Sequence, residues 1–280
     1  MKRLIAGLVS CVPGMYDLFS RKKTGGTISA EYCYEVWMKH LTFLGQSGMN
    51  EIPRTVAELG PGDSLGVGLA ALLSGVERYY ALDVVEYSNI DLNISIFDEL
   101  VGLFRRRASR PSEGWPDYGI YLDSNLFPSH ILTEELLDTT LTESRVESIR
   151  KAILGMGSGT GDSIISYIVP WNESHIIDKE SVDLIYSHAV LEHITDLADT
   201  YEKMWLLLRP GGFLSHQIGL TSHGLTKEWN GYWATPELLW KLAFGRRPYL
   251  INRQPCSKHL ELLESNGFEI ILCYKDIRDS

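Results

Sequence analysis

The stretch Val56-Ala-Glu-Leu-Gly60-Pro-Gly62-Asp-Ser-Leu-Gly66 decides the fold of this 280-residue chain. A short apolar run contains one acidic residue and is followed by glycines and then by an apolar segment. This order predicts a strand, a tight turn and a helix. Glycines allow backbone N–H groups to approach a ligand closely, and the N-terminus of a helix favours negative charge. The stretch therefore predicts a ligand-binding turn.

An acidic residue follows the next strand-like run at a distance that supports this interpretation. Asp83 ends the run Arg78-Tyr-Tyr-Ala-Leu-Asp83, and a carboxylate about 20 residues after such a turn can accept hydrogen bonds from ribose hydroxyls. The glycines are spaced G-x-G-x-x-x-G, one residue longer than the dinucleotide-binding pattern. Together these features predict a site for a nucleoside-type cofactor.

Three later segments complete a pattern that belongs to a known family. Asp183–His193 has the pattern of a strand followed by a helix. Leu207–Leu214 and Glu261–Phe268 each have the pattern of a helix followed by a turn and a strand. With the glycine turn, the chain resembles the class I S-adenosylmethionine-dependent methyltransferases over residues 54–87 and 163–275. The resemblance implies an α/β fold: a Rossmann-like, doubly wound, mostly parallel seven-stranded sheet with helices on both faces.

The resemblance also implies which residues hold the cofactor, S-adenosyl-L-methionine. Glu58, Gly60 and Gly62 would surround the methionine part, and Asp83 would hold the ribose. Trp171 offers a stacking face to the adenine, although core packing is an equally good interpretation. No acidic residue of the kind often found near the adenine follows the third strand. The full set implied is Glu58, Gly60, Pro61, Gly62, Asp83, Val84, Trp171 and Ser187.

Histidines near the strand ends are candidates for a general base. His188 follows the fourth predicted strand, and His216 lies near the end of the fifth; either could accept a proton as a methyl group arrives. His193 is a third candidate, although packing or capping is the commoner role. The eight histidines show no metal-ligand pattern, so no metal is predicted.

Aromatic and basic residues after the fifth strand are candidates for binding the acceptor. Aromatic rings beside guanidinium groups suit a sugar, a nucleotide-sugar or a phosphorylated molecule, while a solvated surface loop is an equally good interpretation. The residues concerned are His223, Trp229, Arg246 and Arg253.

Composition and charge limit the partners and the location. The net charge is −10, from 26 basic and 36 acidic residues, and an acidic surface repels nucleic acid. Four scattered cysteines fit reduced thiols in a cytoplasmic protein, and no apolar run is long enough to span a membrane. The apolar stretch before Cys11 is shorter than a normal signal sequence and predicts an N-terminal helix or arm. The sequence does not decide whether the protein is a monomer or a homo-oligomer.

The predicted organisation has an arm, a core and an insertion. Residues 1–53 form an N-terminal helical arm or lid, with a helix over 27–44; residues 54–280 form the cofactor-binding domain. Strands are expected at 54–59, 78–85, 163–169, 181–187, 213–218 and 268–274. Residues 88–160 form a helical insertion between the second and third strands, expected to cap the cleft. The second glycine run, Gly155–Gly161, follows a helix and precedes a strand, which is the wrong order for a cofactor turn. A helix is expected over 189–208, and others begin near 235 and 257.

The function predicted is methyl transfer from S-adenosylmethionine to a small molecule, such as a sugar or glycan precursor. One alternative is an NAD(P)-dependent oxidoreductase acting on a sugar nucleotide, which the shifted glycine and the lack of a Tyr-x-x-x-Lys pair disfavour. Another is a non-catalytic, cofactor-binding regulatory protein.

Overall fold

The computed structural model describes residues 26–110, 122, 124–156, 164–173, 176–244 and 250–277. These residues divide into two compact units. The sheet unit comprises residues 26–188 and 203–216, and the C-terminal unit comprises residues 189–202 and 217–277. The first part of the predicted arm, most of the second glycine run and Arg246 lie outside the described residues.

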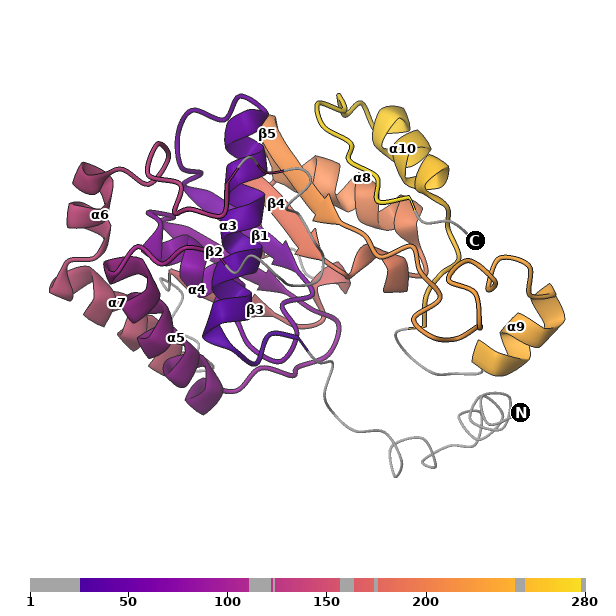
Figure 1. Ribbon diagram of the computed structural model, residues 1–280, viewed down its shortest axis with the longest axis horizontal. Helices are drawn as coiled ribbons and strands as arrows, with labels where there is room; N and C mark the ends of the chain where they lie inside the picture. Colours follow the sequence, from indigo (N-terminus) through magenta and orange to yellow (C-terminus); the bar gives the residue numbers. More distant parts are fainter. Residues whose placement is uncertain are drawn as a thin grey trace. The chain divides into compact units, whose positions relative to one another are not determined.

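A five-stranded sheet is the centre of the sheet unit (Figure 1). Its order is β3-β2-β1-β4-β5, and β1 pairs in parallel with both β2 and β4, as β2 does with β3. The chain therefore reverses its direction of winding between β1 and β4, where ligands collect in open α/β sheets. The strands are β1 Thr55–Leu59, β2 Arg78–Leu82, β3 Ile165–Ile168, β4 Val182–His188 and β5 Leu208–Gln217.

β1 and β2 form where the sequence predicts them because most of their side chains are buried. Four of the five residues of β1 and of β2 are buried, as expected for parallel strands covered by helices. β5 begins at Leu208, five residues before the predicted strand, and is exposed over residues 209–211. The helix after the glycine turn, α4 (Gly66–Leu73), is buried along its whole length. Strand, turn and helix in the deciding stretch are therefore confirmed.

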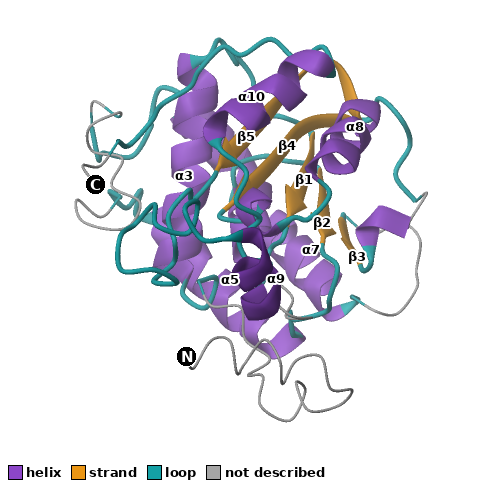
Figure 2. Cartoon of the chain, turned by 90° about the vertical axis from the view of Figure 1, so that its right-hand side faces the viewer, coloured by secondary structure: helices purple, strands orange, loops and turns teal. Residues whose placement is uncertain are grey.

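Helices α3 and α5 pack on α4 and on each other, and Figure 2 shows both to one side of the strands. The side chains of Ser29 and Asn89 accept hydrogen bonds from the first-turn amides of α3 and α5 and so cap both helices. Besides α4, the described residues of this unit before β3 form the helices α3 Ala30–Gln46, α5 Ile90–Arg105, α6 Glu134–Thr140 and α7 Glu143–Leu154.

The described part of the region between β2 and β3 contains the helices α5, α6 and α7, and its role as a cap over the cleft stays a prediction. Phe97 and Leu100 of α5 and Ile149 of α7 are fully buried in the same hydrophobic cluster as Val56 of β1. A helix with apolar residues on one face packs that face against another apolar surface. For α5 and α7 this surface is the hydrophobic core around the sheet.

The C-terminal part differs from the prediction in two places. The helix expected over 189–208 begins only at α8 (Leu197–Leu207), after the short 3₁₀ turn η2 (Leu191–His193). Ala189 has a φ of 57° and Ile194 is extended, and neither conformation continues an α-helix. Two further helices, α9 (Glu237–Phe244) and α10 (Cys256–Ser265), are present as expected.

The predictions of a seven-stranded sheet and of a closing strand over 268–274 are wrong for the described residues. Residues 268–277 form no strand, and Ile271 and Tyr274 are 56% and 48% exposed. An apolar run becomes a sheet strand only where a neighbouring strand and a covering layer bury it, and this run has neither within the described chain.

Candidate functional site

The glycine turn lies at the carboxyl end of β1. Gly60 and Gly62 have φ angles of 63° and 81°, a region that residues with a side chain rarely adopt. The amide of Gly60 donates to the carbonyl of Leu82 at 2.8 Å, which fastens the turn to the end of β2. The two glycines are partly exposed, so their backbone is available to a ligand.

The later glycines, Gly66 and Gly68, are needed for packing. A Cβ on Gly68 would overlap the ring of Tyr79, and one on Gly66 would overlap Cys33 of α3. The displaced third glycine of the sequence pattern therefore brings α3 against α4. The role of Gly68 was not recognised in the sequence, although a glycine inside a helix is itself a signal of close packing.

Glu58 lies beneath the turn and is bound by two tyrosines. Its Oε2 accepts hydrogen bonds from the hydroxyls of Tyr79 at 2.5 Å and Tyr186 at 3.2 Å, one on each neighbouring strand. Only 4% of the residue is exposed, and burial raises the pKa of its carboxyl to about 8. The carboxyl therefore links β1, β2 and β4, and the backbone of Gly68 in α4 also hydrogen-bonds to it. Sequence analysis did not find these partners, because only pairing brings the three side chains together.

Asp83 lies at the carboxyl end of β2, beside the same turn. Its Oδ1 accepts the amide of Val84 at 2.7 Å, and the backbone of Gly62 also hydrogen-bonds to the carboxyl. Burial raises the pKa of this carboxyl, while Val84 remains 47% exposed. The amide of Trp171, in the 3₁₀ turn η1 (Trp171–Glu173), donates to the carbonyl of Asp83 at 2.9 Å.

These residues fit the adenosine part of S-adenosylmethionine. A ribose needs a carboxylate acceptor, and an adenine needs an apolar surface beside it. Asp83 supplies the first, and the exposed Val84 with the half-buried Trp171 supplies the second. Gly60 and Gly62 leave the turn free of side chains. Pro61 is buried between them.

His188 ends β4 next to the glycine turn. Leu59 pairs with Ser187 in the β1–β4 register, so His188 lies one step beyond, level with Gly60. Both of its ring nitrogens are buried without a hydrogen-bond partner among the described residues, and its ring meets those of Tyr32 and His40 edge-on, each at 6.0 Å. Burial lowers the pKa of His188 well below its ordinary value, which keeps the imidazole neutral.

His40 and His216 complete the histidines on this part of the sheet. His40, on α3, shares a hydrogen bond with the hydroxyl of Ser215 at 2.7 Å, and burial lowers its pKa to about 3. His216 Nδ1 lies 2.8 Å from the hydroxyl of Ser187. Two of the predicted residues, Ser187 and His216, are therefore bound to each other. His40 was missed because it comes from a helix far away in the sequence.

In the C-terminal unit, His193 and His223 lie together, with ring centroids 5.4 Å apart. Glu192 is 2% exposed, and its Oε1 accepts the amide of Gly219 at 3.0 Å. Burial raises the pKa of Glu192 to about 7.

Aromatic residues gather in the segment that follows β5, as the sequence indicates. Trp229 and Trp233 meet edge-on at 6.0 Å, and Tyr232 lies 4.8 Å from Trp233. Arg253 lies over Trp240 at 5.1 Å, and its guanidinium donates to the carbonyls of Trp233 and Thr235. These contacts tie the segment to the chain before α10.

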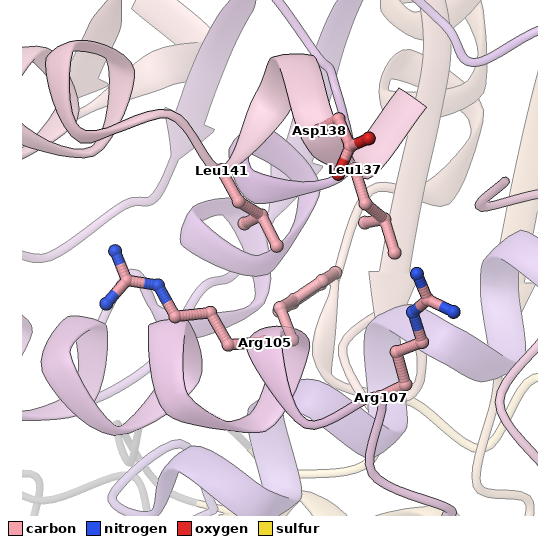
Figure 3. A pocket seen from close by; sticks show the side chains of 6 residues that line it. Arg105, Arg107, Leu137, Asp138 and Leu141 are labelled. Carbon is pink, nitrogen blue, oxygen red and sulfur yellow. The ribbon is translucent and has the colours of Figure 1, made fainter. Parts of the chain in front are cut away.

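A separate hollow of about 250 Å³ lies between the end of α5 and α6 (Figure 3). Phe104, Leu137, Asp138 and Leu141 line it together with Arg105 and Arg107, and Figure 3 shows the two arginines on opposite sides of it. The two arginines pair with Glu143 and Glu134. None of the predicted cofactor residues lines this hollow.

No group of three histidine, cysteine, aspartate or glutamate side chains in the described part of the chain is arranged to hold a metal ion. None of the helices that the described residues form has the length and apolar character needed to cross a membrane.

Residues 147–215 match the family model of a methyltransferase domain. No curated protein matches the chain. Among solved structures, Haemonchus contortus phosphoethanolamine N-methyltransferase 2 with bound S-adenosyl-L-methionine is 15% identical, with a TM-score of 0.41. The match includes 85% of the residues of this chain and 40% of the residues of the Haemonchus protein. An S-adenosylmethionine-dependent methyltransferase from Mesorhizobium loti is 14% identical, with a TM-score of 0.41, over 87% and 82% of the two chains. Likenesses at this level transfer no substrate to this chain.

Proposed function

We propose that this chain is a class I S-adenosylmethionine-dependent methyltransferase and that it transfers a methyl group from S-adenosyl-L-methionine to a small molecule; the match of residues 147–215 to a methyltransferase domain supports the proposal. One observation carries the proposal. The buried carboxyl of Asp83 is hydrogen-bonded beside the left-handed Gly60 and Gly62, at the carboxyl edge of two adjacent parallel strands.

When bound, S-adenosylmethionine supplies a methyl group on a positively charged sulfur, so the protein mainly has to align the acceptor. Asp83 would hold the ribose, and Val84 and Trp171 would border the adenine. Gly60, Pro61 and Gly62 would surround the methionine part. Glu58 supports the turn through Tyr79 and Tyr186 and would act on the cofactor from beneath it.

His188 is the proposed group nearest to the turn that could handle the acceptor's proton. Its backbone is level with Gly60, and its neutral imidazole has a nitrogen able to accept a hydrogen bond. The same lowered pKa makes it a weak base, so its role would be to orient an acceptor hydroxyl or amine. His216, bound to Ser187, and His193, beside His223, are the other candidates.

The acceptor is proposed to be a small molecule, with a sugar or glycan precursor as the first class to test. Support comes from the aromatic segment containing Trp229 and from His223 and Arg253 near it along the chain. Arg246 is proposed from the sequence alone. The acidic net charge of −10 disfavours a nucleic acid as the acceptor.

Calorimetry with two cofactors tests the proposed function. We expect the full chain to bind S-adenosylmethionine and its demethylated product, S-adenosylhomocysteine, and not NADH. Binding of NADH alone would favour an oxidoreductase and overturn the proposal. Binding of S-adenosylmethionine without turnover of a broad panel of sugar, amine and alcohol acceptors would instead indicate a regulatory protein.

A further inference from the structure

Glu192 is a buried carboxyl that the backbone amides of Glu192 itself and of Gly219 satisfy only in part. Its Oε1 accepts the amide of Gly219, while its Oε2 is buried without a partner among the described residues. The backbone amide of Asn252 donates to the backbone carbonyl of Glu192 at 2.6 Å. This bond holds the backbone of Glu192 in place but gives no donor to its Oε2. A buried acceptor left without a donor costs folding free energy, so the arrangement points to a donor supplied by a ligand.

A second acceptor converges on the same place. A Cβ built on Gly219 would lie 2.7 Å from Glu192 Oε1 and 3.2 Å from His223 Nε2. The two atoms therefore meet on one side of Gly219, where any side chain would displace one of them. His223 has a φ of 46°, an unusual conformation for a residue with a side chain. Because His223 is itself exposed, its ring connects the buried carboxyl with the surface.

The charges around this pair favour a cation. Burial lowers the pKa of His223, so its ring is neutral and one nitrogen is an acceptor. No lysine or arginine of the described chain acts on the carboxyl of Glu192, and the guanidinium of Arg253 is bound to Trp233, Thr235 and Glu237.

An aromatic ring also lies within electrostatic range. The charge of Glu192 contributes to raising the pKa of Tyr232 to about 12, after burial as the main cause. The Tyr232 hydroxyl donates to the carbonyl of Leu220 and is not a free donor for Glu192. A carboxyl without a counter-charge, a neutral imidazole and a nearby aromatic ring are complementary to an ammonium group.

We propose that Glu192 and His223 form a receptor for the ammonium group of a small-molecule ligand, beyond the proposed function. An ammonium group has three N–H donors and one positive charge. It would give Glu192 the missing hydrogen bond and counter-charge together, and a second donor would reach His223. A hydroxyl would make the hydrogen bond but leave the charge uncompensated.

The test compares two probes of similar size, propylammonium and 1-propanol, by ligand-observed NMR titration of the full chain. We expect propylammonium to bind at least about tenfold more tightly. Its binding should tighten between about pH 6 and about pH 8, because Glu192 ionises in this range. Glu192→Gln should abolish both the preference and the pH dependence.

Glu264→Gln is the matched control, since it removes one exposed carboxylate from α10 of the same unit, and it should leave both properties unchanged. Gly219→Ala, which crowds both acceptors, provides a second variant if Glu192→Gln does not fold. Equal binding of the two probes, no binding of propylammonium, or a preference that persists in the variants would overturn the proposal. Calorimetry with S-adenosylhomocysteine is run on every variant. Retained binding shows a folded protein, and its absence from the wild type would refute the proposed function separately.

Discussion

At the scale of single residues, the strongest claim concerns Asp83. Asp83→Ala removes the proposed ribose acceptor and also the hydrogen bond that the carboxyl makes with Val84. We expect the affinity for S-adenosylhomocysteine to fall at least about tenfold, measured by calorimetry. Glu86→Ala, at an exposed position three residues later, is the control and should bind normally. Unchanged affinity in Asp83→Ala would remove this residue from the site.

Glu58 makes stability depend on pH. Its folded-state pKa of about 8 lies above the ordinary value of 4.5, so folding takes up a proton between these values. The contribution of Glu58 to stability is therefore present at low pH and is lost as the pH rises through about 8. We expect Glu58→Gln to flatten the fall in unfolding free energy between these pH values, measured by urea denaturation. Glu99→Gln, at an exposed position on α5, should keep the wild-type slope; equal slopes in all three proteins would contradict the prediction.

At the scale of elements, the contact of α4 with β2 depends on one missing side chain. Gly68→Ala drives a methyl group into the ring of Tyr79, and overpacking of this kind costs about 1–3 kcal/mol or more. Gly102→Ala on α5 is the matched control, because its nearest neighbour is the flexible end of Arg106 at 3.4 Å. Since alanine is the better helix former, this variant should be neutral or slightly stabilised. Chemical denaturation measures the unfolding free energy of both variants. A Gly68→Ala variant as stable as the wild type would refute the close contact between Gly68 and Tyr79.

At the scale of the whole molecule, α3 is part of the core of the sheet unit. Trp37 is fully buried, donates to the hydroxyl of Ser74 at 2.7 Å and packs against Tyr186. We expect Trp37→Ala to lower the unfolding free energy by about 3–5 kcal/mol. Trp205→Ala, which removes a ring that is 45% exposed, should cost much less. The boundary at residue 53 and the role of the segment as an arm or lid stay predictions. Equal stability of the two variants would support an independent arm.

Much of the fold could be predicted because it is encoded locally. The glycine turn, its strand and its helix follow from short-range sterics and apolar runs, and Asp83 follows from its distance to the turn. The departures have tertiary causes. The run 268–274 has strand composition but no strand partner, and the expected helix over 189–208 is interrupted by the left-handed Ala189 and the extended Ile194.

The sequence by itself therefore determined the class of fold, the glycine turn and the order in which the strands occur along the chain. Tertiary structure alone decided which distant side chains meet: the tyrosines on Glu58, His40 beside His188, and His223 with Glu192. The physical reason is that turns and periodicity depend on neighbouring residues. Contacts between carboxyl, hydroxyl and imidazole groups depend instead on strand register and helix packing, which no local pattern specifies.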